Sequence, residues 1–167
     1  MRRSLVLLAL FGFGLVGCDQ ASKEVAQTRL QGEPNVHLLG GVVTMAYAEN
    51  PGAFLGLGDR LPDGARVALL VVVNLGILAA LGWWAFRRRQ DVLARVAATL
   101  VIAGGAGNLI DRVMREGGRV VDFMVVRVGP VKTGVFNVAD VAVMIGVGLL
   151  FLQLAWPVRG ARQAKTG

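Results

Sequence analysis

The 167-residue sequence contains a single cysteine, Cys18, and a single histidine, His37. One cysteine excludes an internal disulfide and a multi-cysteine metal site. One histidine excludes a zinc protease of the His-Glu-x-x-His type and leaves a Ser-His-Asp triad possible only around His37. We therefore expect no metal and no other cofactor, so any hydrolytic chemistry has to come from other side chains.

Charge is also scarce, because 17% of the residues are charged whereas 54% are hydrophobic. A soluble domain of this length carries about 25% charged residues, so the shortfall indicates lipid as the solvent. The formal net charge of +7 would suit a nucleic-acid partner. However, the basic residues cluster beside apolar runs, which is typical of sequence next to a membrane. We expect one integral membrane domain over residues 1–167 and no nucleic-acid partner.

Four apolar runs approach the length of about 20 residues that crosses a bilayer. The predicted spans are residues 4–24, 67–86, 92–110 and 137–156. Backbone groups in lipid must be paired within the segment, so the spans should be helices. The predicted fold class is a membrane all-α core of four transmembrane helices.

The two segments between these spans, residues 27–66 and 111–136, do not read as helices. Val36–Tyr47 and Val120–Val128 are rich in β-forming residues, and Asn50-Pro51-Gly52 is a turn signal. We expect a small extracytoplasmic β-sheet layer that rests on the helices. Residues 159–167 are predicted to be a disordered tail.

Basic residues beside the spans predict the orientation. They precede the first span, fill the second connection and follow the fourth span: Arg2, Arg3, Arg87, Arg88, Arg89, Arg95, Arg159, Arg162 and Lys165. Both termini should therefore be cytoplasmic. The outer segment 111–136 is also basic and weakens the rule there.

Cys18 follows two arginines and an apolar stretch, which is the pattern of a lipoprotein signal peptide. The alternative is a small, buried apolar residue within the first span. We favour the alternative, because a product cleaved at Cys18 would keep three further spans.

The segment from Gly104 to Arg112 contains small residues that permit close helix packing, followed by Asn108, Asp111 and Arg112. These three place an amide, a carboxylate and a guanidinium together at the outer interface. For any one of them, a location at the interface and a helix stop is a sufficient explanation.

Asp122 and Asp140 are the other unusual acids. Asp122 interrupts a β-rich apolar run, where an aspartate is usually a solvated edge residue. Asp140 lies three residues after Asn137, so the two can form a capping box at a helix start. That explanation is less complete for Asp140, because residues 139–152 are otherwise apolar and a carboxylate there is costly.

Two adjacent aspartates in a low-dielectric site share one proton. The ionised carboxylate takes a proton from water, and the protonated one polarises a carbonyl and assists the leaving amine. Such a pair hydrolyses peptide bonds without metal, serine or cysteine. The rival interpretation is a non-enzymatic transporter subunit or assembly factor that handles protons or cations.

Five blocks of the sequence occur in an order that resembles lipoprotein signal peptidase (signal peptidase II). They are Asp19–Lys23, Asn50–Phe54, Gly107–Arg112, Val121–Phe123 and Phe136–Asp140. The resemblance implies an aspartyl endopeptidase of the bacterial inner membrane that cuts prolipoproteins before a diacylglyceryl-modified cysteine. It also implies membrane lipid as a partner and a monomeric enzyme.

The resemblance also implies roles for individual residues. Asp122 and Asp140 match the catalytic pair. Four positions match residues at the substrate site: Asn50, Asn108, Arg112 and Asn137. Asp19, Lys23 and Asp111 are expected to support the site. One departure is Phe54, which lies one residue earlier than the family commonly has it, and this puts the local loop shape in doubt.

Overall fold

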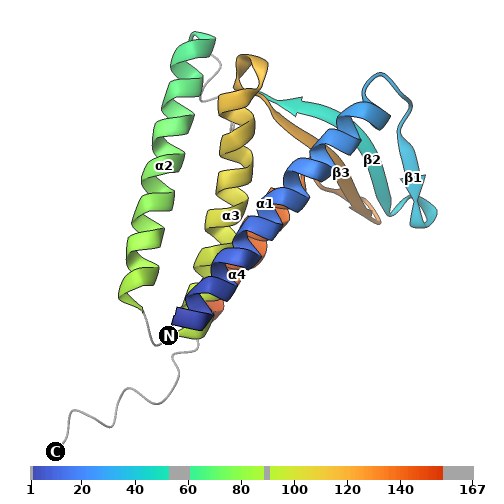
Figure 1. The fold of residues 1–167 in the computed structure, drawn as a ribbon. Coiled ribbons are helices and arrows are strands. Elements are labelled where there is room, and N and C mark those ends of the chain that lie inside the picture. Colours follow the sequence, from blue (N-terminus) through green and yellow to red (C-terminus); the bar gives the residue numbers. More distant parts are fainter. Residues whose placement is uncertain (1, 53–60, 89–90, 156–167) are drawn as a thin grey trace, which may run out of the picture.

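The computed structural model describes residues 2–52, 61–88 and 91–155 (Figure 1). Within them the chain forms helices α1 (Arg2–Leu30), α2 (Asp63–Arg87), α3 (Val92–Met114) and α4 (Val138–Ala155). The strands are β1 (Val36–Leu38), β2 (Val43–Asn50), β3 (Val120–Val128) and β4 (Val131–Lys132). Two short 3₁₀ turns, η1 (Leu39–Gly41) and η3 (Glu116–Gly118), join these elements.

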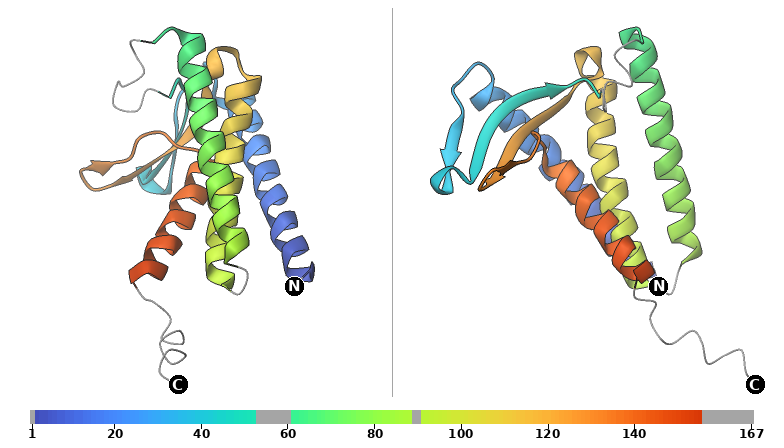
Figure 2. Two further views of the ribbon diagram at one scale, coloured as in Figure 1. Left: turned by 90° about the vertical axis from the view of Figure 1, so that its left-hand side faces the viewer. Right: turned by 180° about the vertical axis from the view of Figure 1, so that it is seen from behind.

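The helices have the length and apolarity of membrane segments. By length and composition, α1, α2 and α3 can each cross a membrane, and α4 contributes a shorter apolar helix. In Figure 2 the start of α1, the end of α2, the start of α3 and the end of α4 lie at one end of the bundle, and the sheet lies beside its other end. The predicted fold class, apolar helices with a small antiparallel sheet, is confirmed.

Several helices extend past the predicted spans. α1 continues to Leu30, because its final turns pack Ala26 and Leu30 against Phe123 of the sheet. α2 begins at Asp63, inside the segment expected to be non-helical. The predicted tail, residues 159–167, lies outside the described residues.

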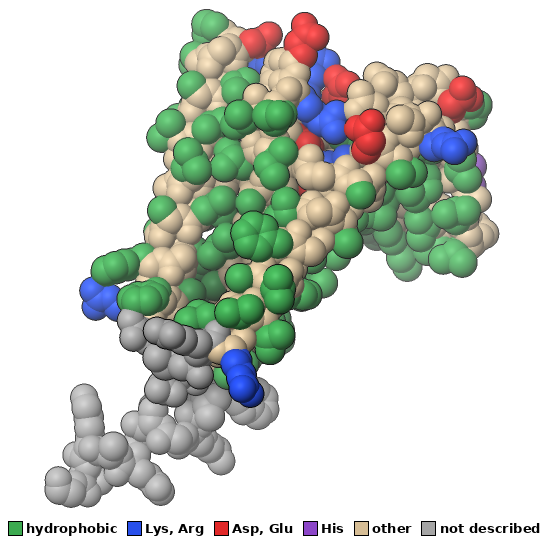
Figure 3. All heavy atoms as spheres, in the orientation of Figure 1, with side chains coloured by type: hydrophobic (Ala, Val, Ile, Leu, Met, Phe, Trp, Pro, Cys, Tyr) green, Lys and Arg blue, Asp and Glu red, His purple; other side chains and the backbone are tan. Residues whose placement is uncertain are grey.

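The outer surface of the helix bundle exposes many large apolar side chains. Space-filling Figure 3 shows apolar side chains covering the helices, while acidic and basic side chains gather mainly at the sheet end. Cys18 is one of the outward-facing residues, so the expectation that it is buried is wrong. Its neighbour Asp19 and Lys23 one turn later point into the protein, and this turns Cys18 to the outside.

Small residues bring α3 and α4 into close contact. A Cβ atom on Gly104 would lie 2.4 Å from the Ala139 carbonyl oxygen, and one on Gly146 would lie 2.7 Å from that of Ala97. Any larger residue at these two positions would force the helices apart. Gly104 therefore allows the first turn of α4 to pack against the middle of α3, and Gly146 allows the middle of α4 to pack against the first turns of α3.

The sheet has the order β1-β2-β3-β4, with every pair antiparallel. Beyond β4 the chain returns along β3, where Phe136 exchanges backbone hydrogen bonds with Met124. Asn137 and α4 follow immediately. This return brings the start of α4 beside the middle of β3.

Candidate active site

Asp122 lies in the middle of the sheet rather than at a solvated edge. In β3 it pairs with Ala48 of β2, and 3% of its surface is exposed. The Asn137 side-chain amide donates to its Oδ1 at 2.6 Å, and the Asn50 amide donates to its Oδ2 at 3.1 Å. The interpretation of Asp122 as a solvated edge residue is therefore wrong, because β2 and the returning chain cover both sides of β3.

Asp140 lies in the first turn of α4 and forms the capping box that the sequence predicts. Its carboxylate accepts from the Asn137 backbone N–H at 3.1 Å, and its own N–H donates to Asn137 Oδ1 at 2.9 Å. The same Asn137 side chain donates to Asp122. The Asn137 side chain therefore caps the start of α4 and also links Asp140 to Asp122.

A second asparagine links α3 to the pair. Asn108 Nδ2 donates to Asp140 Oδ1 at 2.8 Å, and Asn108 Oδ1 accepts from Asn137 Nδ2 at 3.1 Å. The carboxylates of Asp122 and Asp140 thus belong to one network that is held by amides from β2, α3 and the start of α4.

The electrostatics of this network make Asp122 easier to protonate than an exposed aspartate. The pKa of Asp122 is raised to about 6, mainly by burial and also by the negative charge of Asp140, although the hydrogen bonds from Asn50 and Asn137 and the charge of Lys23 act to lower it. A carboxyl group with this pKa exchanges its proton close to neutral pH. The arrangement can therefore hold one proton between two acids, as acid–base chemistry requires.

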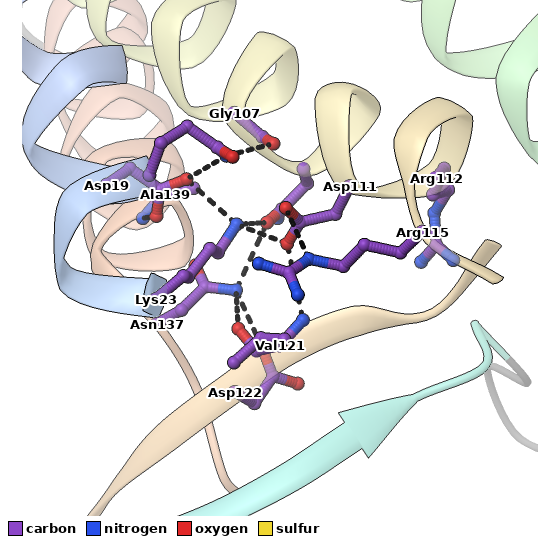
Figure 4. A network of polar contacts seen from close by, with 12 residues as sticks. Asp19, Lys23, Gly107, Asp111, Arg112, Arg115, Val121, Asp122, Asn137 and Ala139 are labelled. Atoms are coloured by element: carbon purple, nitrogen blue, oxygen red, sulfur yellow. Dashed lines mark hydrogen bonds and ion pairs between the residues drawn. The ribbon is translucent and has the colours of Figure 1, made fainter. Parts of the chain in front are cut away.

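Figure 4 shows a buried ion triad, formed by Asp19, Lys23 and Asp111, in the same polar network as Asp122 and Asn137. Lys23 Nζ is 2.8 Å from Asp19 Oδ2 and 2.9 Å from Asp111 Oδ2. The Lys23 side chain has no exposed surface, and each carboxylate is 1% exposed. The ions come from α1 and α3, so the triad joins the two helices within the protein.

The three polar residues that end α3 have different partners in the structure. Asn108 donates to Asp140, and Asp111 belongs to the ion triad, whose Lys23 also donates to Asn108. Arg112 points elsewhere: its Nη1 donates to the Gly118 carbonyl at 3.0 Å, and its guanidinium lies against Gly52. Residues three positions apart share a helix face, and the expectation that these residues lie together agrees with Asn108 and Asp111, which share Lys23 as a partner. Arg112 instead lies beside the turn that follows Asn50.

One contributor was not anticipated as part of the site. Arg115 Nε donates to Asp111 Oδ1 at 3.1 Å, and Arg115 Nη1 donates to Gln27 at 2.6 Å. The spacing of four residues between Asp111 and Arg115 on one helix is the signal that would have identified this pair. Phe54, the residue at which the sequence departs from the family pattern, lies outside the described residues.

The sequence of this chain is similar to those of known proteins. The family model for signal peptidase (SPase) II matches residues 11–156. Two relatives named lipoprotein signal peptidase are each 36% identical to this chain. The match to the Moorella thermoacetica protein covers 91% of this chain and 93% of the relative, and that to the Symbiobacterium thermophilum protein covers 81% and 86%.

The fold also matches a solved structure, described as a bacterial membrane enzyme structure obtained by the in meso method at 1.9 Å resolution. The TM-score is 0.79 at 27% identity, over 95% of this chain and 96% of the solved one. With the family model spanning most of the sequence, the chain belongs to the signal peptidase II family.

Proposed function

We propose that this protein is an aspartyl endopeptidase that removes signal peptides from bacterial prolipoproteins, cleaving before the diacylglyceryl-modified cysteine. Membership of the signal peptidase II family supports the reaction class. The observation that carries the mechanism is the single Asn137 side chain that hydrogen-bonds Asp122 and caps the turn holding Asp140.

In the proposed reaction Asp122 and Asp140 share one proton. The ionised carboxylate removes a proton from water, which attacks the scissile carbonyl carbon. The protonated carboxyl polarises the carbonyl oxygen and then protonates the leaving amine. The raised pKa of Asp122 supports this division, because it keeps one carboxyl protonated in a larger fraction of molecules.

Four neighbouring residues are proposed to contact the substrate: Asn50, Asn108, Arg112 and Asn137. Asn108 and Asn137 donate to the carboxylates and so fix the surface that meets the scissile bond. Asn50 and Arg112 lie at the Asn50–Gly52 turn, on the sheet side of the pair. A guanidinium and an amide at that turn suit the backbone carbonyls of an extended peptide.

We also propose that the chain is a single membrane domain that acts as a monomer in the inner membrane. Its termini would be cytoplasmic and the aspartate pair would lie near the periplasmic face. Arg87 stacks on Trp83 and Arg88 on Trp84 at the end away from the sheet, which suits a cytoplasmic interface. The acyl chains of the substrate would lie in the bilayer beside the apolar helices.

The decisive experiment compares a diacylated prolipoprotein with its unlipidated counterpart as substrates of the purified protein. The same assay includes Asp122→Asn and Asp140→Asn, and Asp63→Asn as an exposed acid control. We expect cleavage of the lipidated substrate by the unmodified protein and by Asp63→Asn. Each of the two site variants should lose on the order of a thousandfold in kcat.

Two results would overturn the proposal at different points. Cleavage of neither substrate would remove the peptidase assignment, and equal cleavage of both would remove the dependence on lipid. Full activity in folded Asp122→Asn or Asp140→Asn would leave a peptidase but would remove the aspartate mechanism.

A further inference from the structure

The buried ion triad contacts the backbone immediately before each aspartate of the site. Asp19 Oδ1 accepts the N–H of Ala139 at 2.9 Å, and Ala139 precedes Asp140. Asp111 Oδ2 accepts the N–H of Val121 at 3.2 Å, and Val121 precedes Asp122. Each triad carboxylate therefore holds the residue next to one member of the pair.

Lys23 connects these two attachments. Its ammonium lies within 2.9 Å of both carboxylates, so it fixes the distance between Asp19 and Asp111. It also donates to Asn108 Oδ1 at 2.9 Å. Because that oxygen is engaged, the amide nitrogen of Asn108 faces Asp140, to which it donates.

The energetics of burial argue that the triad serves positioning more than stability. Removing an ion pair from water costs about as much as the attraction between the ions returns, and apolar replacements of similar volume are often equally stable. The surroundings here are closely packed: a Cβ on Gly107 would lie 2.6 Å from Asp19 Oδ2. An apolar residue would fill the same space but would offer no acceptors to the two backbone N–H groups.

We propose that Asp19, Lys23 and Asp111 act as positioning residues that set the separation of Asp122 and Asp140 and the orientation of the Asn108 amide. The inference rests on the proposed function. It gives the triad a defined task, which is to hold two separate elements, β3 and α4, at the spacing that lets their carboxylates share a proton.

The test is Lys23→Met in the full-length protein, with Lys132→Met as the matched control on the exposed strand β4. We expect the Lys23 variant to lose on the order of a hundredfold in kcat, as small misplacements of reacting groups do, with KM almost unchanged. The control should retain both constants. Near-normal KM distinguishes positioning from loss of the substrate site.

The pH profile supplies a readout that a purely structural role would not move. The positive charge of Lys23 lowers the pKa of Asp122, against the effects of burial and of Asp140. In Lys23→Met the limb of the kcat/KM profile that reports loss of the last proton should therefore shift to higher pH. In Lys132→Met it should stay in place.

Asp111→Asn is the second variant, which decides the matter if Lys23→Met does not fold. Asparagine keeps an oxygen where Asp111 Oδ2 accepts from the Val121 N–H and Lys23, but it removes the negative charge that pairs with Lys23. It also replaces Oδ1 with an NH₂ donor that faces the Arg115 Nε donor. We expect a fall in kcat of roughly tenfold or more, with Asp63→Asn as the exposed control.

Wild-type kcat and an unshifted pH limb in a folded triad variant would overturn the positioning role. This outcome is separable from failure of the proposed function. If the positioning inference alone is wrong, Asp122→Asn and Asp140→Asn remain inactive while the triad variants cleave normally. If the function is wrong, the site variants also cleave normally or the unmodified protein cleaves nothing.

Discussion

Helix α2 and the junction of α1, α3, α4 and β3 differ sharply in how deeply their side chains are buried. None of the residues of α2, all of which the structure describes, is buried, and Val72 is 66% exposed. At the junction Asp19, Lys23 and Asp111 are almost completely buried. The contrast is typical of a membrane protein. Apolar side chains face the lipid, whereas charged side chains lie inside the protein and pair with one another.

Apart from the two aspartates, the largest expected effect comes from removing an amide from the junction. Asn108→Leu deletes the donor to Asp140 and the acceptor of Lys23 and Asn137. We expect kcat to fall roughly 10²- to 10³-fold, the loss typical of removing a preorganised donor in a water-poor site. The measurement is steady-state cleavage of the lipidated substrate.

Asn74→Leu is the control for this variant, because Asn74 lies on α2 and makes one long hydrogen bond, 3.3 Å to the Gly105 carbonyl. An interhelical hydrogen bond of this kind is worth about 0.6 kcal/mol, so activity should be close to that of the unmodified protein. Equal losses in the two variants would abolish the distinction between the junction and the lipid-facing helices.

The next effect tests the lipid-facing side. Val72→Asp places a carboxylate on the exposed face of α2. A charge at the centre of a span costs about 2.5 to 3.5 kcal/mol on insertion scales. Thermal unfolding in lipid nanodiscs should show clear destabilisation relative to the uncharged control Val72→Thr. Unchanged stability would mean that this face contacts water.

A smaller effect is expected where the helices pack. Gly146→Ala should destabilise the protein by about 1 to 3 kcal/mol, because its methyl group would meet the Ala97 carbonyl and Val101. Gly148→Ala on the same helix meets no atom within 4 Å and should leave the melting temperature unchanged. A reversed order of the two melting temperatures would contradict the α3–α4 contact.

The smallest effect concerns pH. With the pKa of Asp122 raised to about 6, the pair holds its last proton below that pH and loses it above. The kcat/KM profile should therefore fall above an apparent pKa of about 6, which belongs to the pair as a unit. A profile that rises through this region would contradict the shared proton.

Asn50→Ala refines this pH prediction. The Asn50 amide stabilises ionised Asp122, so its loss should move the descending limb to higher pH by less than about one unit. Asn35→Ala, in the exposed loop before β1, is the control and should leave the limb where it is. A shift to lower pH in Asn50→Ala would show that the hydrogen bond favours the protonated form.

The sequence by itself determined the class of the protein and the candidate chemistry. Scarce charge and long apolar runs required helices in lipid, and the β-rich stretches required strands outside them. The capping box of Asn137 and Asp140 was readable because it is a local pattern of four residues. A single histidine and a single cysteine left the carboxylates as the candidates for hydrolysis.

Only the tertiary structure decided what the individual acids do. Asp122 reads as a strand-edge residue until Phe136 returns along β3 and brings Asn137 to its carboxylate. Asp19 and Lys23 look like interruptions of an apolar helix until Asp111 completes their charge network from α3. These assignments depend on contacts between residues up to 120 positions apart, and local propensity carries no information about such contacts.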